Sequence, residues 1–324
     1  MLRRHAFVGM LGAAAGLARV PRTSAQGGKV YRVGILAPGP LRPIESFKQR
    51  LRERGWVEGS TIRFEDRWAQ GDEGRYVALA AELAALPVDL IMTWSTPAVL
   101  AAKRATTTIP IVMAAIADPV GVGAVASLAR PGGNVTGFST QNFELEAKRL
   151  ELLREIVPDM VRVALLANTT NSYVMAALPQ VKAIAEASGL QADALALDIP
   201  ADLDSGLVRL RQARPDGVLV LAAPAFFPLR RALAEFMTAN RLPAVYPFPE
   251  FVEAGGLICY STNFDDLFRQ AADYVDKILR GAVPGELPVQ QAATFKLIVN
   301  LKAAKAIGLA MPQAVLIRAD EVIE

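Results

Sequence analysis

The chain carries one pattern of strand and helix signals twice, and this repetition is the strongest constraint on its fold. The run YRVGILA at 31–37 returns as VRVALLA at 161–167, and DLIMT at 89–93 returns as DGVLV at 216–220, each of the latter followed by a proline at the same distance. Short apolar runs bounded by turn residues and helical patterns are typical of strands buried on both faces of a parallel sheet. Because the order of the matches is preserved, the sequence predicts an α/β fold of two doubly wound, Rossmann-like lobes in tandem.

The end of the chain departs from the repeat. Residues 265–281 have apolar side chains at helical spacing, and residues 287–291 and 295–299 have the pattern of extended segments. A helix is predicted at 301–308 and a final strand near 315–317. Because these segments have no counterpart in the repeat, we expect them to cross back between the two lobes. Several crossings between two lobes make a hinge, which suits closure around a ligand.

Residues 1–28 have the features of an export signal. Arg3 and Arg4 form a basic start, the apolar run at 8–18 is too short to span a bilayer, and Ala25 follows small residues suited to cleavage. A twin-arginine signal and a general secretory signal both fit this pattern. We therefore expect a periplasmic protein that is cleaved near Ala25 and, since no other stretch could span a bilayer, is not inserted in the membrane.

Removal of this signal changes what chemistry the chain can perform. It takes away four arginines and no acidic residue, so the formal charge falls from +3 to −1 and a nucleic-acid partner is not expected. It also removes His5, the only histidine, which excludes a Ser-His-Asp triad and a His-ligated metal. Cys259 lies in an apolar run and is expected to be a buried, inert thiol. We expect no catalytic residue, metal or cofactor.

The best candidate for a binding site is the turn between the predicted strand at 88–93 and the following helix. Ser95 or Thr96 can cap that helix, and Pro97 suits its first turn. The free amides at a helix start favour an anion such as a carboxylate, and open α/β sheets bind ligands at the carboxyl ends of their strands. In the second lobe the turn at 222–227 is expected to face this one. For the Ser95 and Thr96 hydroxyls, plain helix capping is the alternative function.

Further candidates follow other strand ends, and each has a structural alternative. Trp94 either stacks on a planar ligand or belongs to the core. Asp118 either receives a ligand ammonium group or caps the next helix, and for Tyr246 simple packing is a serious rival. The remaining candidates for ligand contacts are Ser139, Asn168, Ser172, Tyr173, Phe226 and Tyr260.

Several segments resemble those of a known family. The resemblance rests on GWVEG at 55–59, ATTTIPIV at 105–112, DPVG at 118–121, SLARPGGNVTG at 127–137, KRLELL at 148–153, EAGG at 253–256, YVDKIL at 274–279, NLKAAK at 300–305 and ADEVI at 319–323. Together they look like the signature segments of the ABC-transporter substrate-binding family that includes tryptophan/tyrosine uptake proteins. The chain departs from the family pattern at Ala293, where a proline is usual, and at Ser261, where a glycine is usual.

This resemblance implies a type I periplasmic-binding-protein fold with three crossings. The expected N-terminal lobe is 29–140 plus about 262–285, and the C-terminal lobe is 141–261 plus about 286–324. Proteins similar to this one bind a small solute in the cleft, often with a carboxylate on the turn matching Ser95 and Thr96, and deliver it to an ABC permease in the inner membrane. We expect a monomer that binds an amino acid, aromatic or branched, or an aromatic acid without an amine.

Two other functions remain open at this level. The chain could be a sensor domain that presents a solute to a membrane receptor kinase. A dinucleotide-dependent enzyme is a more distant alternative, because no Gly-x-Gly-x-x-Gly follows the strand that ends at Ala37.

Overall fold

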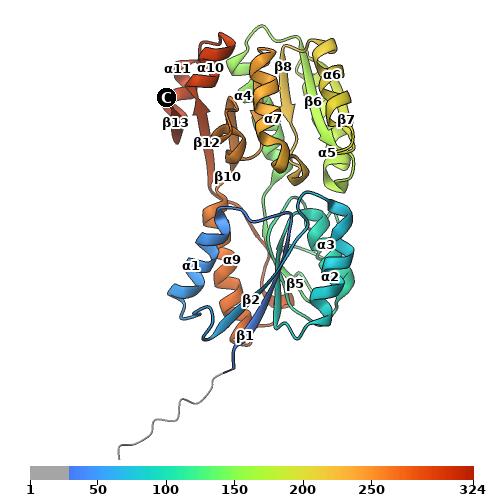
Figure 1. Ribbon diagram of the computed structural model, residues 1–324, viewed down its shortest axis with the longest axis vertical. Coiled ribbons are helices and arrows are strands. Elements are labelled where there is room, and N and C mark those ends of the chain that lie inside the picture. The colour runs from blue at the N-terminus through green and yellow to red at the C-terminus, as the bar shows by residue number, and fades with distance from the viewer. Residues whose placement is uncertain (1–28) are drawn as a thin grey trace, which may run out of the picture.

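A computed structural model describes residues 29–324. Within them the strands form two separate sheets, one in each of two lobes, and the lobes lie one above the other (Figure 1). The first sheet has the order β11-β5-β4-β3-β1-β2, and each of its neighbouring strand pairs is parallel. Its strands are β1 (Tyr31–Ala37), β2 (Ile62–Trp68), β3 (Leu90–Trp94), β4 (Ile111–Ile116), β5 (Val135–Ser139) and β11 (Gln290–Gln291).

The second sheet repeats this order as β7-β6-β8-β9-β10 and adds two strands at its edge. One of them, β12, runs antiparallel to β10, and β13 runs parallel to β12. Its strands are β6 (Arg162–Asn168), β7 (Gln191–Leu197), β8 (Gly217–Val220), β9 (Ala244–Tyr246), β10 (Ile258–Thr262), β12 (Phe295–Asn300) and β13 (Glu321–Ile323). The predicted fold class of two doubly wound α/β lobes is confirmed.

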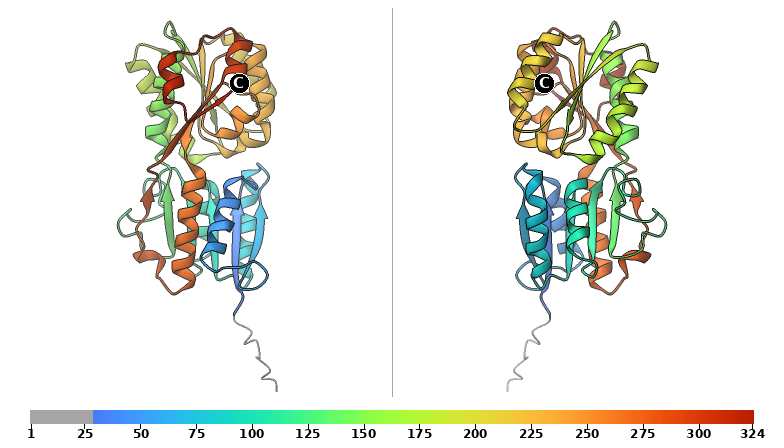
Figure 2. Two further views of the ribbon diagram at one scale, coloured as in Figure 1. Left: turned by 90° about the vertical axis from the view of Figure 1, so that its left-hand side faces the viewer. Right: turned by 90° about the vertical axis from the view of Figure 1, so that its right-hand side faces the viewer.

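Helices cover the sheets and bury their apolar strands (Figure 2). In the first lobe α1 (Pro43–Glu53) and α9 (Phe264–Leu279) pack together on one face, and α2 (Tyr76–Ala85) and α3 (Thr96–Ala105) pack on the other. The second lobe contains α4 (Asn142–Ile156), α5 (Ser172–Ala187), α6 (Leu203–Ala213), α7 (Arg230–Ala239), α8 (Pro249–Glu253), α10 (Leu301–Ile307) and α11 (Gln313–Arg318). Short 3-10 turns are η1 (Glu73–Arg75), η2 (Pro224–Leu229) and η3 (Pro284–Glu286).

The repeated aspartates make the same contact in both lobes. The Asp89 carboxylate accepts a hydrogen bond from the backbone N–H of Arg32 at 2.8 Å, and the Asp216 carboxylate accepts one from the N–H of Arg162 at 2.7 Å. Each aspartate precedes the third strand of its lobe and bonds to the first strand. The repeat in the sequence therefore corresponds to a repeated device that sets the register between adjacent strands.

Three chain segments cross between the lobes, and hydrogen bonds join them to one another. The first follows β5 at Thr140, the second follows β10 at Thr262, and the third follows β11 near Ala292. The Thr262 hydroxyl donates to the Thr140 carbonyl at 3.2 Å, and the Gln141 side-chain amide donates to the Ala292 carbonyl at 2.7 Å. The backbone N–H of Asn263 donates to the Thr294 carbonyl at 2.9 Å. Hydrogen bonds thus join the three crossings into one narrow hinge.

Two details of the tail differ from the sequence expectation. The boundary expected near residue 285 lies further along, because β11 pairs with β5 and keeps residues 290–291 in the first sheet. The strand expected near 315–317 is instead part of the helix α11, which directs Val315 into the core and leaves Ile317 exposed. In so short a segment, the spacing of the apolar side chains fits a helix as well as a strand. The edge strand is β13, a few residues later.

No helix within the described residues is long and apolar enough to cross a membrane. The expected signal peptide at 1–28 lies outside the described residues.

Side chains also join the lobes away from the hinge. The Thr170 hydroxyl of the second lobe donates to the Glu73 carboxylate of the first at 3.3 Å, and Arg42 Nη1 lies 3.7 Å from Glu253 Oε1. At Gly71, whose φ is +84°, a Cβ atom would come within 2.9 Å of the Pro228 ring across the gap. Burial between the lobes raises the pKa of Glu73 from its ordinary value of 4.5 to about 7.

We expect Glu73→Gln to stabilise the protein at pH 8 and to stabilise it much less at pH 5. The folded protein holds the Glu73 proton more tightly than the unfolded chain does, so the contribution of Glu73 to stability is greatest at low pH and is lost as the pH rises through about 7. A glutamine carries no charge and still offers Thr170 an acceptor. Thermal unfolding followed by circular dichroism at both pH values measures the difference. Glu186→Gln, at an exposed site on α5, is the control; an equal gain for Glu73→Gln at both pH values would contradict the expectation.

Candidate functional site

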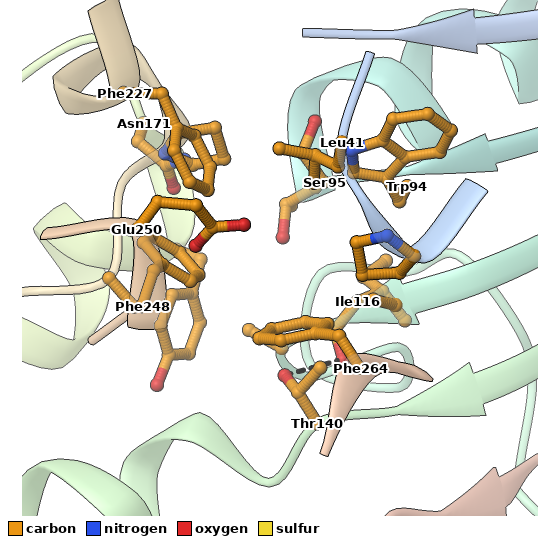
Figure 3. A pocket seen from close by; sticks show the side chains of 17 residues that line it. Leu41, Trp94, Ser95, Ile116, Thr140, Asn171, Phe227, Phe248, Glu250 and Phe264 are labelled. Atoms are coloured by element: carbon orange, nitrogen blue, oxygen red, sulfur yellow. Dashed lines mark hydrogen bonds between the residues drawn. The ribbon is translucent and has the colours of Figure 1, made fainter. Parts of the chain in front are cut away.

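A cavity of about 570 Å³, partly open to solvent, lies between the two lobes (Figure 3). The first lobe supplies the turn between β3 and α3, the end of β4 and the start of α9. The second lobe supplies the start of α5, the segment after β8 and the start of α8. The crossing residue Thr140 lies at its hinge side, where its hydroxyl donates to the Ile116 carbonyl at 3.2 Å. This is the position at the carboxyl ends of the strands that doubly wound folds use for ligands.

The turn between β3 and α3 presents hydrogen-bond donors to the cavity. Ser95 has a φ of +72°, a conformation that costs a residue other than glycine about 1–3 kcal/mol and that often marks a functional site. The Ser95 hydroxyl is buried and makes no hydrogen bond, although the Tyr76 hydroxyl lies near it. Thr96 begins α3, whose first amides have no partner within the helix. These groups and the helix dipole together favour an anion.

Of the two alternatives considered for Trp94, the structure shows the core position, and the residue also borders the cavity. Its ring packs inside the first lobe, with centroid distances of 5.9 Å to Trp68 and 5.2 Å to Phe268, and only 3% of the residue is exposed. The indole also borders the cavity beside Ser95, and its N–H is buried without a partner. The side chain is therefore a core residue that keeps one unused donor at the cavity.

Glu250 brings a carboxylate from the second lobe into these apolar surroundings. It lies at the start of α8, and Figure 3 shows its carboxylate pointing into the cavity toward the wall that carries Ser95. Its Oε2 atom is buried and has no hydrogen-bond partner. Burial raises the pKa of Glu250, and a hydrogen bond from its own backbone N–H and the positive charges of Arg230 and Arg42 oppose that rise. A buried, unpaired carboxylate is costly, and a ligand cation would relieve that cost.

Aromatic side chains form the rest of the wall. The rings of Phe227 and Phe248 stack at 4.6 Å, and Phe264 from the start of α9 lies 5.8 Å from Phe248. Phe226, the aromatic residue predicted for this wall, is fully buried in the core of the second lobe. The tight 3-10 turn of η2 explains the exchange, because adjacent side chains in such a turn point about 120° apart. Phe227 therefore faces the cavity while Phe226 faces the core.

The start of α5 contributes two residues to the cavity. Tyr173 borders it with its hydroxyl buried and unpartnered, and burial raises the pKa of that hydroxyl. Asn171 also lines the cavity, while its side chain accepts from the Val174 N–H at 3.2 Å and caps the helix. Ser172, which the sequence analysis favoured, is exposed and does not line the cavity.

Three polar candidates lie outside this cavity because local hydrogen bonds occupy them. The Asp118 carboxylate accepts from the Gly121 N–H at 2.8 Å, which is close to the capping alternative considered for it. The Ser139 hydroxyl donates to the Ala117 carbonyl at 3.1 Å. Both residues border an adjoining groove. The side-chain amide of Asn168 donates to the Thr170 hydroxyl at 2.8 Å.

Two aromatic candidates are also directed away. Tyr246 is fully buried and stacks on Phe251 at 5.0 Å, so packing, the rival interpretation, describes its position. Tyr260 stacks on Phe295 at 6.0 Å on another surface of the second lobe. Of the predicted site residues, the structure brings Trp94, Ser95, Thr96 and Tyr173 to the cavity. It adds Asn171, Phe227, Phe248 and Glu250 from the second lobe.

Cys259 is fully buried in β10, and burial raises the pKa of its thiol to about 12. The reactive thiolate is therefore scarce near neutral pH, as expected of an inert core cysteine.

Comparison with known proteins identifies the family. A family model described as ABC transporter substrate binding protein matches residues 33–323. A tyrosine-binding protein of Clostridioides difficile (strain R20291) is 25% identical over 271 residues, which cover 82% of this chain and 76% of that protein. The ABC domain from Streptococcus pneumonia in complex with L-Trp is 25% identical, covers 91% of this chain and 100% of its own, and has a TM-score of 0.84.

A third relative is a ligand-free, open structure of a substrate binding protein with adhesive properties from Clostridium difficile. It is 25% identical, the alignment covers 91% of this chain and 99% of that chain, and its TM-score is 0.64. With a family match over nearly all described residues and the same two-lobe architecture, this chain belongs to the ABC transporter substrate-binding protein family.

Proposed function

We propose that this protein is the exported receptor of an ABC importer and that it binds a free α-amino acid with a large apolar side chain. One observation carries the proposal. The cavity opposes the unpaired donors of Ser95 and the start of α3 in one lobe to the unpaired carboxylate of Glu250 in the other. A wall of hydrogen-bond donors at a helix N-terminus, facing a wall with a carboxylate, matches the carboxylate and ammonium groups of a zwitterion.

Each part of the ligand has a matching wall. Its carboxylate accepts from the Ser95 and Thr96 side chains and from the first amides of α3. Its ammonium group donates to Glu250. Its side chain packs among Phe227, Phe248 and Trp94, and aromatic walls contribute much contact area of this kind.

The charge on Glu250 favours an amino acid over an aromatic acid without an amine. Such an acid would bring its own carboxylate into the cavity and leave Glu250 without a cation. Removing water from an unpaired carboxylate is costly, so that complex would be weak unless Glu250 took up a proton.

The relatives support both the ligand class and a closed state. One binds tyrosine and another holds L-Trp, and these are the ligands that the aromatic walls favour. At equal identity, the chain superposes better on the L-Trp complex than on the ligand-free, open relative. The lobes thus lie near the arrangement expected around a bound solute. In this proposal the signal at 1–28 directs export of the protein. The closed, solute-bound form then delivers the solute to a permease in the inner membrane.

We expect L-Trp or L-Tyr to raise the melting temperature of the mature protein. Tryptamine, which lacks the carboxylate, and indole-3-propionate, which lacks the ammonium group, should bind at least about 30-fold more weakly than L-Trp. Tryptamine leaves the donors of Ser95 and α3 without an acceptor, at a cost of about 1–3 kcal/mol for each buried group, and indole-3-propionate leaves the Glu250 carboxylate unpaired, at a cost of about 2–5 kcal/mol. Thermal-shift assays with all proteinogenic amino acids, followed by calorimetric titration of these analogues, measure both effects. Equal binding of the two analogues and L-Trp would exclude recognition of a zwitterion, and no shift with any amino acid would exclude the ligand class.

Glu250→Gln should weaken L-Trp binding by about 30-fold or more and leave indole-3-propionate binding unchanged or tighter. The variant removes the partner of the ammonium group but also the charge that repels an acid. Glu235→Gln is a matched control, because Glu235 lies on α7 of the same lobe and is exposed. A loss of affinity for both ligands in equal measure would show that Glu250 acts on the shape of the cavity and not on charge.

Thr96→Val should weaken L-Trp binding about tenfold without lowering the melting temperature of the ligand-free protein. The variant keeps the shape of the side chain and removes one hydroxyl near the expected carboxylate, and a hydrogen bond to a charged group contributes about 1.5–3 kcal/mol. Calorimetric titration measures the affinity. An unchanged affinity would remove the Thr96 hydroxyl from the site.

A further inference from the structure

The second lobe buries an ion pair directly behind the cavity wall. Glu146 and Arg149 lie one turn apart on α4, each is 1% exposed, and Arg149 Nη1 lies 3.0 Å from Glu146 Oε1. Taking two charges out of water is expensive, and apolar residues of similar volume often serve stability as well or better. The contacts that Glu146 and Arg149 make with other segments should therefore explain why the pair is buried here.

Glu146 holds the segment that lines the cavity. Its Oε1 atom accepts a hydrogen bond from the backbone N–H of Ala222 at 3.0 Å. Ala222 borders the cavity and begins the segment 222–227, which includes Phe227. Among the described residues, the other hydrogen bonds of this segment join it to itself or to the flanking residues Leu221 and Arg230. The Glu146 carboxylate is thus the hydrogen-bonded link between segment 222–227 and another element.

Arg149 holds the strand that leads into the hinge. Its Nε atom donates to the Tyr260 carbonyl at 2.7 Å, two residues before the second crossing at Thr262. Thr262 in turn bonds to Thr140 in the first crossing, and α4 itself begins just after that crossing. One buried pair therefore connects segment 222–227 with both of these crossings.

We propose that Glu146 and Arg149 are positioning residues that make segment 222–227 move as one body with the hinge. The inference rests on the proposed function, in which rotation at the crossings closes the lobes around a solute. Rotation of α4 and β10 then carries Ala222 and Phe227 onto the ligand through the two hydrogen bonds. A charged acceptor and a charged donor suit this task, because hydrogen bonds to ionised groups are about twice as strong as neutral ones.

Two variants separate positioning from stability. In Glu146→Leu/Arg149→Met an apolar pair replaces the ion pair and leaves no charge unpaired, so the melting temperature should fall less than in Glu146→Gln, although the Ala222 amide loses its partner. The affinity for L-Trp or L-Tyr should nevertheless fall about tenfold or more, because segment 222–227 has lost its link. Glu146→Gln should behave in the opposite way. It leaves Arg149 unpaired and lowers the melting temperature, but it keeps an oxygen for the Ala222 amide and therefore most of the affinity.

Hydrogen exchange of the ligand-free protein gives a readout that does not depend on the ligand. The Ala222 amide should exchange as slowly as the amides in the middle of α4 in the wild type and much faster in the double variant. Wild-type affinity in the double variant, or a wild-type Ala222 amide that exchanges much faster than those of α4, would overturn the proposal. The second result decides even if the double variant does not fold. If the wild type binds no amino acid, the proposed function fails while the exchange measurement still tests the link.

Discussion

The hydrogen bonds among the three crossings are the constraint on which the rest of the structure depends. Each lobe has its own sheet and core, so nothing in the fold of one lobe dictates where the other lies. The bonds from Thr262 to Thr140, from Gln141 to Ala292 and from Asn263 to Thr294 hold three strands side by side. Three linked crossings resist twisting and sliding more than bending, so they favour a hinge rotation. In the proposed function, that rotation brings the two walls of the cavity together.

The cavity concentrates polar groups that the protein itself does not pair. The Trp94 indole N–H, the Ser95 and Tyr173 hydroxyls and one Glu250 oxygen are all buried without a hydrogen-bond partner, and all four residues line the cavity. An unsatisfied buried polar group costs about 1–3 kcal/mol, and most folded proteins avoid it. Together with the strained backbone of Ser95, this pattern indicates a cavity whose partner groups are supplied by a ligand.

Much of the first lobe's share of the site could be predicted from sequence, and much of the second lobe's share could not. Local signals predict the turn at Trp94–Pro97, because a buried strand, capping residues and a proline follow one another in the sequence. Glu250, by contrast, is a single acid after a short strand, and nothing local separates it from a solvated glutamate. The repeat did contain a hint, since Asp118 follows β4 as Glu250 follows the matching strand β9. The exchange of Phe226 for Phe227 depends on a 3-10 turn, and a shift of one residue there reverses which side chain faces the cavity.

The chemistry of the cavity suits binding and not nucleophilic catalysis. A serine nucleophile needs a base within hydrogen-bond reach, but the Ser95 hydroxyl has no such partner. Its titratable neighbour, Tyr76, has a hydroxyl whose pKa burial raises, so that hydroxyl stays protonated near neutral pH and is not available to take the serine proton. Glu250 belongs to the opposite lobe, and the proposed function assigns its carboxylate to a ligand ammonium group. The same turn that would be reactive beside a base is therefore, in the proposed function, a set of donors for a ligand carboxylate.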